Sequence, residues 1–572
     1  MSLYGEERAE GLLALLRILV ARHRDQRKGG RQGPRWSERD SLLISYGDSV
    51  QFPGLHPLAG LKEFLDRRLV GVFSMVHLLP FFPYSSDDGF AVTDFRAVNP
   101  DLGNWRDIAA LGEHFDLIFD LVLNHMSREH LWFVQYMYNE RPGRGFVIEV
   151  DPTENLSMVV RPRSTPLLSR ARTPRGIRHV WATFSNDQID LNYANPEMLL
   201  EMVDILLGYI RQGARGLRLD AVAYLWKRIG TPCIHLPETH EVVKLFRDLL
   251  DYLEPAVILL TETNVPHAEN VSYFGVGDEA HLVYQFSLPP LVLHAIHTGV
   301  TGYLTAWARG LESAPVPPGC TFLNFTASHD GVGLRPLEGL IPGEEVGRLL
   351  EDMRSRGGYV SMRATREGCD RPYELNISYF DAFRDPGEAV DPWQAPRFLL
   401  SQTLPLALQG IPAVYINALT ATPNDPLGVE RTGMTRSINR RKWDGLELER
   451  LLDDPESLAG QVFREYLRRL RLRQGLPAFH PEATQRVLEL GEGLFAVERV
   501  SRDAAQRLLA LHNCTQERRK VACTELAEGR WTDVLEPGAL EPGGGSLTLG
   551  PYQTMWLVQT PSEAGAVATA IG

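Results

Sequence analysis

GLRLDAV (216–222) is the stretch that decides the fold, because in it a short apolar run ends on a carboxylate, Asp220. The same arrangement recurs in AVILLTETN (256–264), which carries Glu262, and in CTFLNFTASHD (320–330), which ends on Asp330. An enzyme that breaks a sugar bond through a covalent intermediate needs one carboxylate as nucleophile and a second as proton donor and acceptor. A third often holds the sugar, so this chain offers a complete set.

Outward from these three segments, five more have the pattern of short buried strands: 41–48, 71–81, 115–125, 281–288 and 413–419. Helix-like segments such as 196–212 and 236–253 separate most of them. Apolar strands that alternate with amphipathic helices predict a parallel sheet buried on both faces, and eight such units predict an α/β fold, the closed (β/α)8 TIM barrel. Its strand ends form one catalytic face, where the carboxylates meet.

The alternation of strand-like and helix-like segments along the chain predicts its division into domains. Residues 1–40 read as a helical extension, 41–125, 186–334 and 385–476 as the barrel, and 477–560 as a small antiparallel β domain with short alternating runs. Segments 126–185, after strand 3, and 335–384, after strand 7, are too long for ordinary loops. We therefore expect two insertions that cover the barrel mouth.

Composition excludes several functions. The net charge of -13 argues against a nucleic-acid binder, and no apolar run approaches the ~20 residues of a membrane helix. Five scattered Cys show no metal-ligand spacing, and no calcium loop is present, so we expect neither a metal nor another cofactor. The same cysteines form no disulfide framework, which favours a reducing cytoplasm, and the start of the chain lacks a signal-peptide pattern. The sequence predicts no particular oligomeric state.

Four motifs in order, DLVLNH (120–125), GLRLDAV, LLTETN (259–264) and FTASHD (325–330), resemble the signatures of glycoside hydrolase family 13. Further segments resemble its sucrose-phosphorylase-like branch: YGDSV (46–50), LLPFFPYSSDDGF (78–90), GTPCIHLPET (230–239), SLPPLVLHAIHTG (287–299) and RSINR (436–440). The resemblance implies transfer of a glucosyl unit between a small glucoside and inorganic phosphate, with retention. Phosphate is then a co-substrate and no cofactor is needed.

The resemblance also implies roles for individual residues. Asp220 would attack the anomeric carbon, and Glu262 would protonate the departing oxygen and later assist the acceptor. Asp330 would bind sugar hydroxyls, with His125 and His329 as donors beside it. A retaining pair of carboxyl groups is expected to lie about 5 to 5.5 Å apart.

Two arginines complete the expected glucose site. Arg218 precedes Asp220 by two residues and so shares its strand face, where a permanent positive charge favours the carboxylate. Asp48 and Arg436 resemble the branch's pair that clamps glucose at its closed end. Such a clamp implies a pocket for one glucosyl unit.

The first insertion contains VRPRS, whose Arg161 and Arg163 resemble an element that contacts phosphate in the branch. We assign the contact to Arg163, since a guanidinium group can bind phosphate with two hydrogen bonds. Tyr373, in PYELN, resembles a residue of the loop that reorganises between glucosyl transfer and phosphate attack. The alternative reading is an arginine on a solvated insertion.

The acceptor is where the chain departs from sucrose phosphorylase. Glu374 stands where that enzyme typically has Gln, and Phe95 where it often has His or Tyr. These departures resemble the glucosylglycerate and glucosylglycerol phosphorylases of the branch. A surplus of arginine favours glycerate, whose carboxylate it could hold: Arg161, Arg163, Arg366 and Arg371. Glu374 argues against an anionic acceptor unless an arginine intervenes.

The sequence therefore predicts phosphorolysis of 2-O-α-glucosylglycerate, with glucosylglycerol, sucrose or sucrose 6′-phosphate as alternative donors. A hydrolase or a glucan-forming transglucosidase would keep the same three carboxylates but lack the phosphate contact. A non-catalytic binding protein with this fold would usually have lost one of the three, and this chain has them all.

Overall fold

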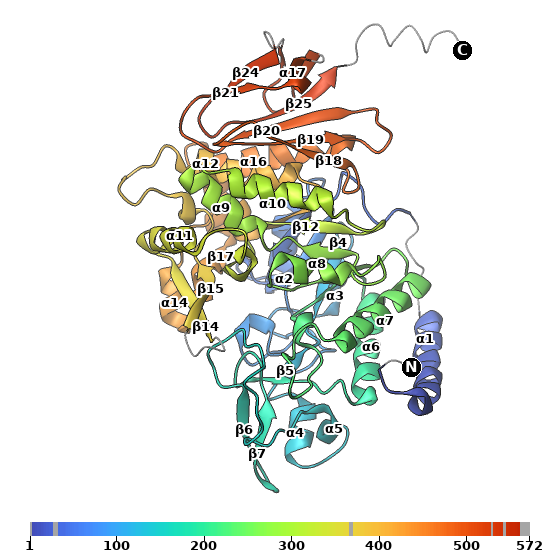
Figure 1. Ribbon diagram of the computed structural model, residues 1–572. Helices are drawn as coiled ribbons and strands as arrows, with labels where there is room; N and C mark the ends of the chain where they lie inside the picture. Colours follow the sequence, from blue (N-terminus) through green and yellow to red (C-terminus); the bar gives the residue numbers. More distant parts are fainter. Residues whose placement is uncertain (1–2, 27–32, 365–369, 528–529, 541–544, 561–572) are drawn as a thin grey trace, which may run out of the picture.

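Eight parallel strands close into a barrel in the computed structural model, which describes residues 3–26, 33–364, 370–527, 530–540 and 545–560 (Figure 1). The order around the barrel follows the chain, and the last strand pairs with the first. The strands are β1 (Leu42–Ser45), β3 (Met75–Leu78), β4 (Asp116–Leu121), β9 (Ala214–Leu219), β10 (Ile258–Thr261), β11 (Leu282–Tyr284), β12 (Thr321–Asn324) and β16 (Ile411–Tyr415). The predicted TIM barrel is confirmed.

Helices surround the barrel, among them α2 (Pro57–Arg68), α6 (Pro196–Arg211), α7 (Pro237–Leu253), α9 (Leu288–Thr298), α12 (Gln394–Ala407) and α16 (Leu458–Gln474). Local chemistry explains the start of α6: the Asn195 side chain accepts a hydrogen bond from the Glu197 N–H, and Pro196 occupies the first helical position. The prediction of a strand over 413–419 was wrong at its end, because α13 (Ile416–Leu419) follows β16 directly. A short buried apolar run does not distinguish strand from helix.

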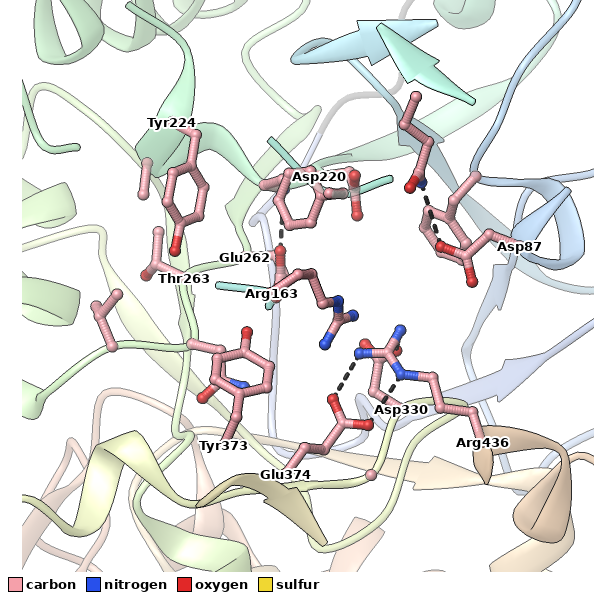
Figure 2. A pocket seen from close by; sticks show the side chains of 18 of the residues that line it. Asp87, Arg163, Asp220, Tyr224, Glu262, Thr263, Asp330, Tyr373, Glu374 and Arg436 are labelled. Atoms are coloured by element: carbon pink, nitrogen blue, oxygen red, sulfur yellow. Dashed lines mark hydrogen bonds and ion pairs between the residues drawn. The ribbon is translucent and has the colours of Figure 1, made fainter. Parts of the chain in front are cut away.

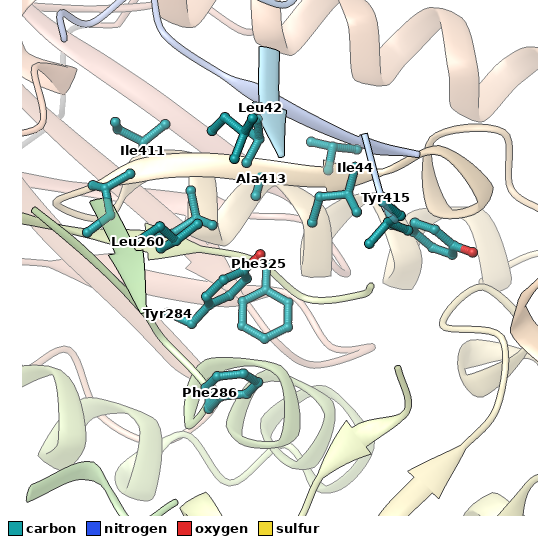
Figure 3. Packing of buried hydrophobic residues seen from close by; sticks show 14 of the residues in the cluster. Leu42, Ile44, Leu260, Tyr284, Phe286, Phe325, Ile411, Ala413 and Tyr415 are labelled. Carbon is teal, nitrogen blue, oxygen red and sulfur yellow. The ribbon is translucent and has the colours of Figure 1, made fainter. Parts of the chain in front are cut away.

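Alternate residues of each strand point into the barrel and fill it (Figure 3). Leu42 of β1 is level with Ala413 of β16. Toward the catalytic face the filling becomes aromatic: the rings of Tyr284 and Phe325 meet edge to face at 5.2 Å, and Phe286 meets Phe325 at 5.3 Å. These rings form a rigid floor beneath the residues at the strand ends.

Both long segments between strands form small sheets. In the first, β5 (His125–Ser127) pairs with β8 (Gln188–Asp190) and β6 (Leu168–Thr173) with β7 (Gly176–Trp181), beside α4 (Leu131–Met137) and α5 (Gly143–Phe146). In the second, β13 (Val332–Gly333), β15 (Asp370–Asn376) and β14 (Tyr359–Ala364) form a sheet next to α11 (Gly343–Ser355). The exact domain boundaries stay a prediction.

The C-terminal part contains a six-stranded antiparallel sheet, at the top of Figure 1. Its strands are β18 (Thr484–Leu488), β19 (Leu494–Val500), β20 (Arg507–Asn513), β25 (Thr554–Thr560), β22 (Arg530–Asp533) and β23 (Gly538–Leu540). A two-stranded sheet of β21 (Arg519–Ala522) and β24 (Ser546–Leu549) accompanies it.

The N-terminal helix α1 (Glu6–Gln26) lies along α6 on the outside of the barrel (Figure 1). The Tyr4 hydroxyl donates a hydrogen bond to the Tyr193 carbonyl at 2.8 Å, and buried His23 lies 3.2 Å from Glu254. Within the ranges given above, no helix has the length and apolarity needed to cross a membrane.

Candidate active site

Asp220, Glu262 and Asp330 line one cavity at the carboxyl ends of the barrel strands (Figure 2). Asp220 follows β9 directly and Glu262 follows β10, while Asp330 lies in the loop between β12 and β13. The cavity has a volume of about 70 Å³ that the centres of water molecules can occupy. That volume holds several water molecules.

One guanidinium group organises the nucleophile side of the cavity. Arg218 Nη1 lies 2.9 Å from Asp220 Oδ1, and its other arm is 4.0 Å from Glu262 Oε2. Arg218 also pairs with buried Asp120, the residue level with it on β4. Beneath it, the Tyr284 ring centroid is 5.8 Å from the guanidinium carbon. Arg218 therefore ties Asp220 and Glu262 to the barrel floor.

The backbone turns sharply after Asp220. Ala221 has a φ of +50°, and its N–H donates a hydrogen bond of 2.9 Å to Glu262 Oε2. A left-handed conformation is uncommon for alanine and costs energy. This strained turn places the backbone that follows Asp220 against the Glu262 carboxylate.

Burial raises the pKa of Asp220 well above its usual range and raises the pKa of Glu262 as well, while Arg218 opposes both shifts. Arg218 opposes the rise of the Asp220 pKa only in part, because its one charge is shared with Asp120 and Glu262. The carboxyls of Asp220 and Glu262 are therefore each harder to ionise than an exposed one. The contact at 2.9 Å, against 4.0 Å for Glu262, places the Arg218 charge closer to Asp220 and favours the anion there.

Asp330 belongs to a chain of charges that reaches the second insertion. Arg436 Nη1 lies 2.6 Å from Asp330 Oδ1, and Arg436 also donates two hydrogen bonds, of 2.9 and 2.5 Å, to the Glu374 carboxylate. Burial alone would raise the pKa of Asp330, but the guanidinium groups of Arg436 and Arg440 hold it well below its usual range. Asp330 is thus a permanent anion, and Glu374 is neutralised by an intervening arginine.

Both predicted histidines line the cavity. The His329 ring stacks on Phe90, with centroids 5.1 Å apart, and His125 Nε2 lies 3.0 Å from the Phe90 carbonyl. Burial lowers the pKa of His125 and lowers that of His329 well below its usual range. Both rings are therefore neutral hydrogen-bonding groups.

The predicted pairing of Asp48 with Arg436 is wrong. Asp48 forms an ion pair with Lys442 beside a separate small cavity. Asp87, unlike Asp48, lines the cavity together with Arg436, and its charge adds to those of Asp330 and Glu374 in raising the pKa of Arg436. Asp87 lies in the segment SSDDGF, which the sequence reading used only as a family likeness.

Asp87 and its neighbour Asp88 face different surroundings. Both have left-handed backbones, with φ of +55° and +48°. Asp87 accepts a hydrogen bond of 3.2 Å from Gln188 in the cavity wall, whereas Asp88 pairs with Arg440 at 2.7 Å. The strained backbone at these two residues thus directs the Asp87 side chain toward the cavity and the Asp88 side chain toward Arg440.

Arg163 and Tyr373 both line the cavity, and the guanidinium carbon lies 5.2 Å from the Tyr373 ring centroid. Arg161 instead donates to the backbone carbonyls of Ser164 and Thr165. Arg371 is on β15 and does not line the cavity, and Arg366 lies outside the described residues.

The remaining acceptor marker, Phe95, is buried and stacks on Trp132, with centroids 5.6 Å apart. It supports the first insertion and does not line the cavity. The sequence reading also missed further lining residues, among them Gln188, Tyr224 and Asn264. Asn264 directly follows the TET motif, so its position after a strand was the available signal. Its amide oxygen is buried without a hydrogen-bond partner in the described structure.

Asn124 takes part in a buried polar cluster. Lys227 Nζ lies 2.6 Å from Asp190 Oδ2 and donates a hydrogen bond of 2.7 Å to Asn124 Oδ1. The Lys227 ammonium group supplies the positive charge of this cluster. Across the part of the chain with described coordinates, no group of three or more His, Cys, Asp or Glu side chains could hold a metal ion.

Comparison with known proteins places this geometry in a family. The family model of the α-amylase catalytic domain matches residues 59–305. The glucosylglycerate phosphorylase of Spirochaeta thermophila is 46% identical, over 91% of this chain and 89% of the relative. That of Escherichia coli is 42% identical, over 92% and 93%. The sucrose phosphorylase of Agrobacterium vitis is 30% identical, over 77% and 88%.

Among solved structures, sucrose 6F-phosphate phosphorylase from Thermoanaerobacter thermosaccharolyticum superposes with a TM-score of 0.72 at 24% identity, covering 83% of this chain and 94% of that one. It shows the same fold. Barrel and strand-end carboxylates together define an α-amylase-type enzyme. This chain belongs to glycoside hydrolase family 13, in the branch of glucoside phosphorylases that contains these relatives.

Proposed function

We propose that this chain is a retaining phosphorylase that transfers an α-glucosyl unit from 2-O-α-glucosylglycerate to phosphate. The products are α-glucose 1-phosphate and glycerate. One observation carries the choice of donor: relatives named glucosylglycerate phosphorylase are 42 to 46% identical over at least 91% of the chain, against 30% for the sucrose phosphorylase described above.

In the first half-reaction, an Asp220 oxygen forms a bond to the anomeric carbon, and the bond from that carbon to O2 of glycerate breaks. The proton on Glu262 moves to the departing oxygen. The required starting state is an ionised Asp220 next to Arg218 and a protonated Glu262. Glycerate then leaves, and Glu262 remains ionised beside the glucosyl ester of Asp220.

In the second half-reaction, a phosphate oxygen attacks the same carbon and the ester bond to Asp220 breaks. The proton of the attacking hydroxyl passes to Glu262, which restores the pair. Two inversions at one carbon give overall retention. The step needs no metal or other cofactor, and phosphate is the co-substrate.

Three side chains support recognition of the glucosyl unit. Asp330 and Asp87 are carboxylates that can accept hydrogen bonds from sugar hydroxyls, and neutral His329 can donate. Arg436 holds Asp330 in place. Because these groups close the cavity on one side, we propose that it takes a single glucosyl unit.

Four of the five cysteines lie in described segments, and they are unpaired thiols: Cys233, Cys320, Cys514 and Cys523. Unpaired thiols are typical of a reducing compartment, and we propose a cytoplasmic location.

The test is a reverse-direction panel. Phosphate release from glucose 1-phosphate is measured with glycerate, glycerol, fructose or fructose 6-phosphate as acceptor. We expect glycerate to give the highest kcat/KM. Preference for fructose would overturn the choice of substrate, and release of free glucose that added acceptor or phosphate does not reduce would indicate a hydrolase. Asp220→Ala serves as the blank, with exposed Asp248→Asn as the matched control.

A further inference from the structure

We propose that His77 is a positioning residue for the nucleophile: through Asp120, it sets how much of the Arg218 charge reaches Asp220. The inference rests on the proposed role of Asp220. It adds a residue on β3 that lies outside the lining of the cavity and acts on the reaction only through other side chains.

Two donors share the carboxylate of Asp120. His77 Nε2 lies 2.7 Å from Oδ2, and Arg218 Nη1 donates a hydrogen bond to Oδ1. The side chains of His77 and Asp120 are both completely buried. An ionised carboxylate only accepts hydrogen bonds, so the ring nitrogen that faces Asp120 must carry a hydrogen. Each oxygen of Asp120 thus has a donor of its own.

In the described structure, Asp120 is the polar partner of the His77 ring. The other ring nitrogen, Nδ1, is buried without a hydrogen-bond partner. On the side of β1 the residue level with His77 is Ile44, which carries no charge. The other charged or titratable groups that face Asp120 are Arg218, His329 and Asp220. The ring therefore serves to hold one carboxylate.

The hold on Asp120 matters because Arg218 has one charge for several carboxylates. Burial would raise the pKa of Asp120, but Arg218 and His77 hold it below its usual range, so Asp120 is a permanent anion. The same Arg218 nitrogen lies 2.9 Å from Asp220 Oδ1. Burial raises the pKa of Asp220, and the charges of Glu262 and Asp120 add to that rise. A second donor on Asp120 therefore leaves more of the Arg218 charge for the nucleophile.

Three substitutions separate positioning from packing. His77→Leu keeps a buried side chain of comparable size but removes the donor, so Arg218 alone must stabilise Asp120. His77→Gln keeps an amide N–H at about the reach of Nε2 and can donate to the same oxygen. His77→Asn also carries an amide, but its shorter side chain reaches only the position of Nδ1.

The experiment measures kcat/KM against pH for hydrolysis of an aryl α-glucoside. Loss of the donor should raise the pKa of Asp220, which must be ionised to react. We therefore expect the acid limb to move about one pH unit upward in His77→Leu and His77→Asn, with a roughly tenfold loss of kcat/KM below the limb. In His77→Gln the limb should return close to its wild-type position.

His281 provides the matched control. It is another completely buried barrel histidine, it lies 3.4 Å from Asp251, and it does not line the cavity. His281→Leu should leave the acid limb in place. Thermal unfolding of each variant shows that the compared proteins are folded, and His77→Gln with His77→Asn still gives the comparison if His77→Leu is not.

An acid limb that stays in place in His77→Leu and His77→Asn, whatever the loss of rate, would limit His77 to packing and overturn the proposal. A shift to lower pH would also overturn it, because Asp120 would then have taken up a proton and released Arg218. Equal shifts in the Gln and Leu variants would exclude the hydrogen bond as the cause. Residual activity of Asp220→Ala near the wild-type level would instead overturn the proposed function, so the two failures are distinguishable.

Discussion

At the scale of single residues, the buried pair Asp220 and Glu262 predicts the pH dependence of the reaction. Burial raises both pKa values above the ordinary value of about 4. Activity should rise with pH as the pair loses its first proton, since Asp220 must be an anion, and fall as Glu262 loses the second. We expect a bell-shaped profile of kcat/KM for an aryl α-glucoside, with both limbs above about pH 4.

The aryl donor keeps the titration of phosphate out of this measurement. Glu262→Gln should lose the alkaline limb, because its amide does not titrate. An acid limb in the range of an exposed aspartate would contradict the raised pKa of the pair.

Two neighbouring acidic loops provide a second prediction. Asp87→Asn should reduce kcat/KM for the glucosyl donor about 10- to 100-fold, because a charge-assisted hydrogen bond to the sugar is lost. Asp48→Asn should change it less than threefold, since Asp48 pairs with Lys442 outside the main cavity. Steady-state measurement of kcat/KM for both variants tests which aspartate binds glucose. A larger loss for Asp48→Asn than for Asp87→Asn would place Asp48 in the glucose site.

Comparison of Asp87 with Asp220 and Glu262 shows which site residues can be predicted from the sequence. Asp220 and Glu262 were predictable because each directly follows a buried strand, and the barrel fixes where such positions point. Asp87 was not, because its direction depends on a left-handed turn in a loop. The raised pKa of Asp220 was also out of reach, since it depends on how many carboxylates share Arg218.

At the scale of elements, Lys227 joins the loop after β9 to the first insertion. Its ammonium group bridges Asn124 and Asp190, and the Asp190 side chain is completely buried. Lys227→Met leaves that carboxylate without its counter-ion, which typically costs about 3 to 5 kcal/mol. We expect a lower Tm and faster proteolysis within 126–190, measured by thermal unfolding and limited digestion.

Lys244→Met is the control, because Lys244 makes only partly exposed ion pairs, with Asp278 at 3.4 Å and with Glu241 at 3.9 Å. Equal effects of the two substitutions would show that the buried bridge contributes nothing special. The sequence indicated the insertion by its length but not this anchor, because the three partners are distant in the chain and meet only after folding.

At the scale of the whole molecule, the barrel was predictable because its eight strands and their helices recur in chain order, so that neighbours in sequence are neighbours in space. The pairings inside the insertions were not, since they join segments such as β13 and β15 across an intervening helix. For α1 the sequence showed only the helical spacing of its apolar residues, and it did not indicate that the helix packs on α6.

Deletion of residues 1–26 tests the role of α1. The loss exposes apolar residues of α6 such as Leu199 and Val203, and leaves Glu254 without His23. Burial of one such side chain is worth about 1.5 to 3 kcal/mol, so Tm should fall. kcat/KM should stay within about twofold, because α1 contributes no residue to the cavity. A large loss of activity in a folded variant would show that α1 shapes the site.

The pairing of β1 with β16 has a consequence for synthesis on the ribosome. Residues 42–45 emerge long before 411–415, and at ~5 to 20 residues per second the delay is about 20 to 70 s. Until then the growing sheet has two open edges, and Arg436 is not yet available to Asp330. A nascent chain in this state is a natural client for molecular chaperones.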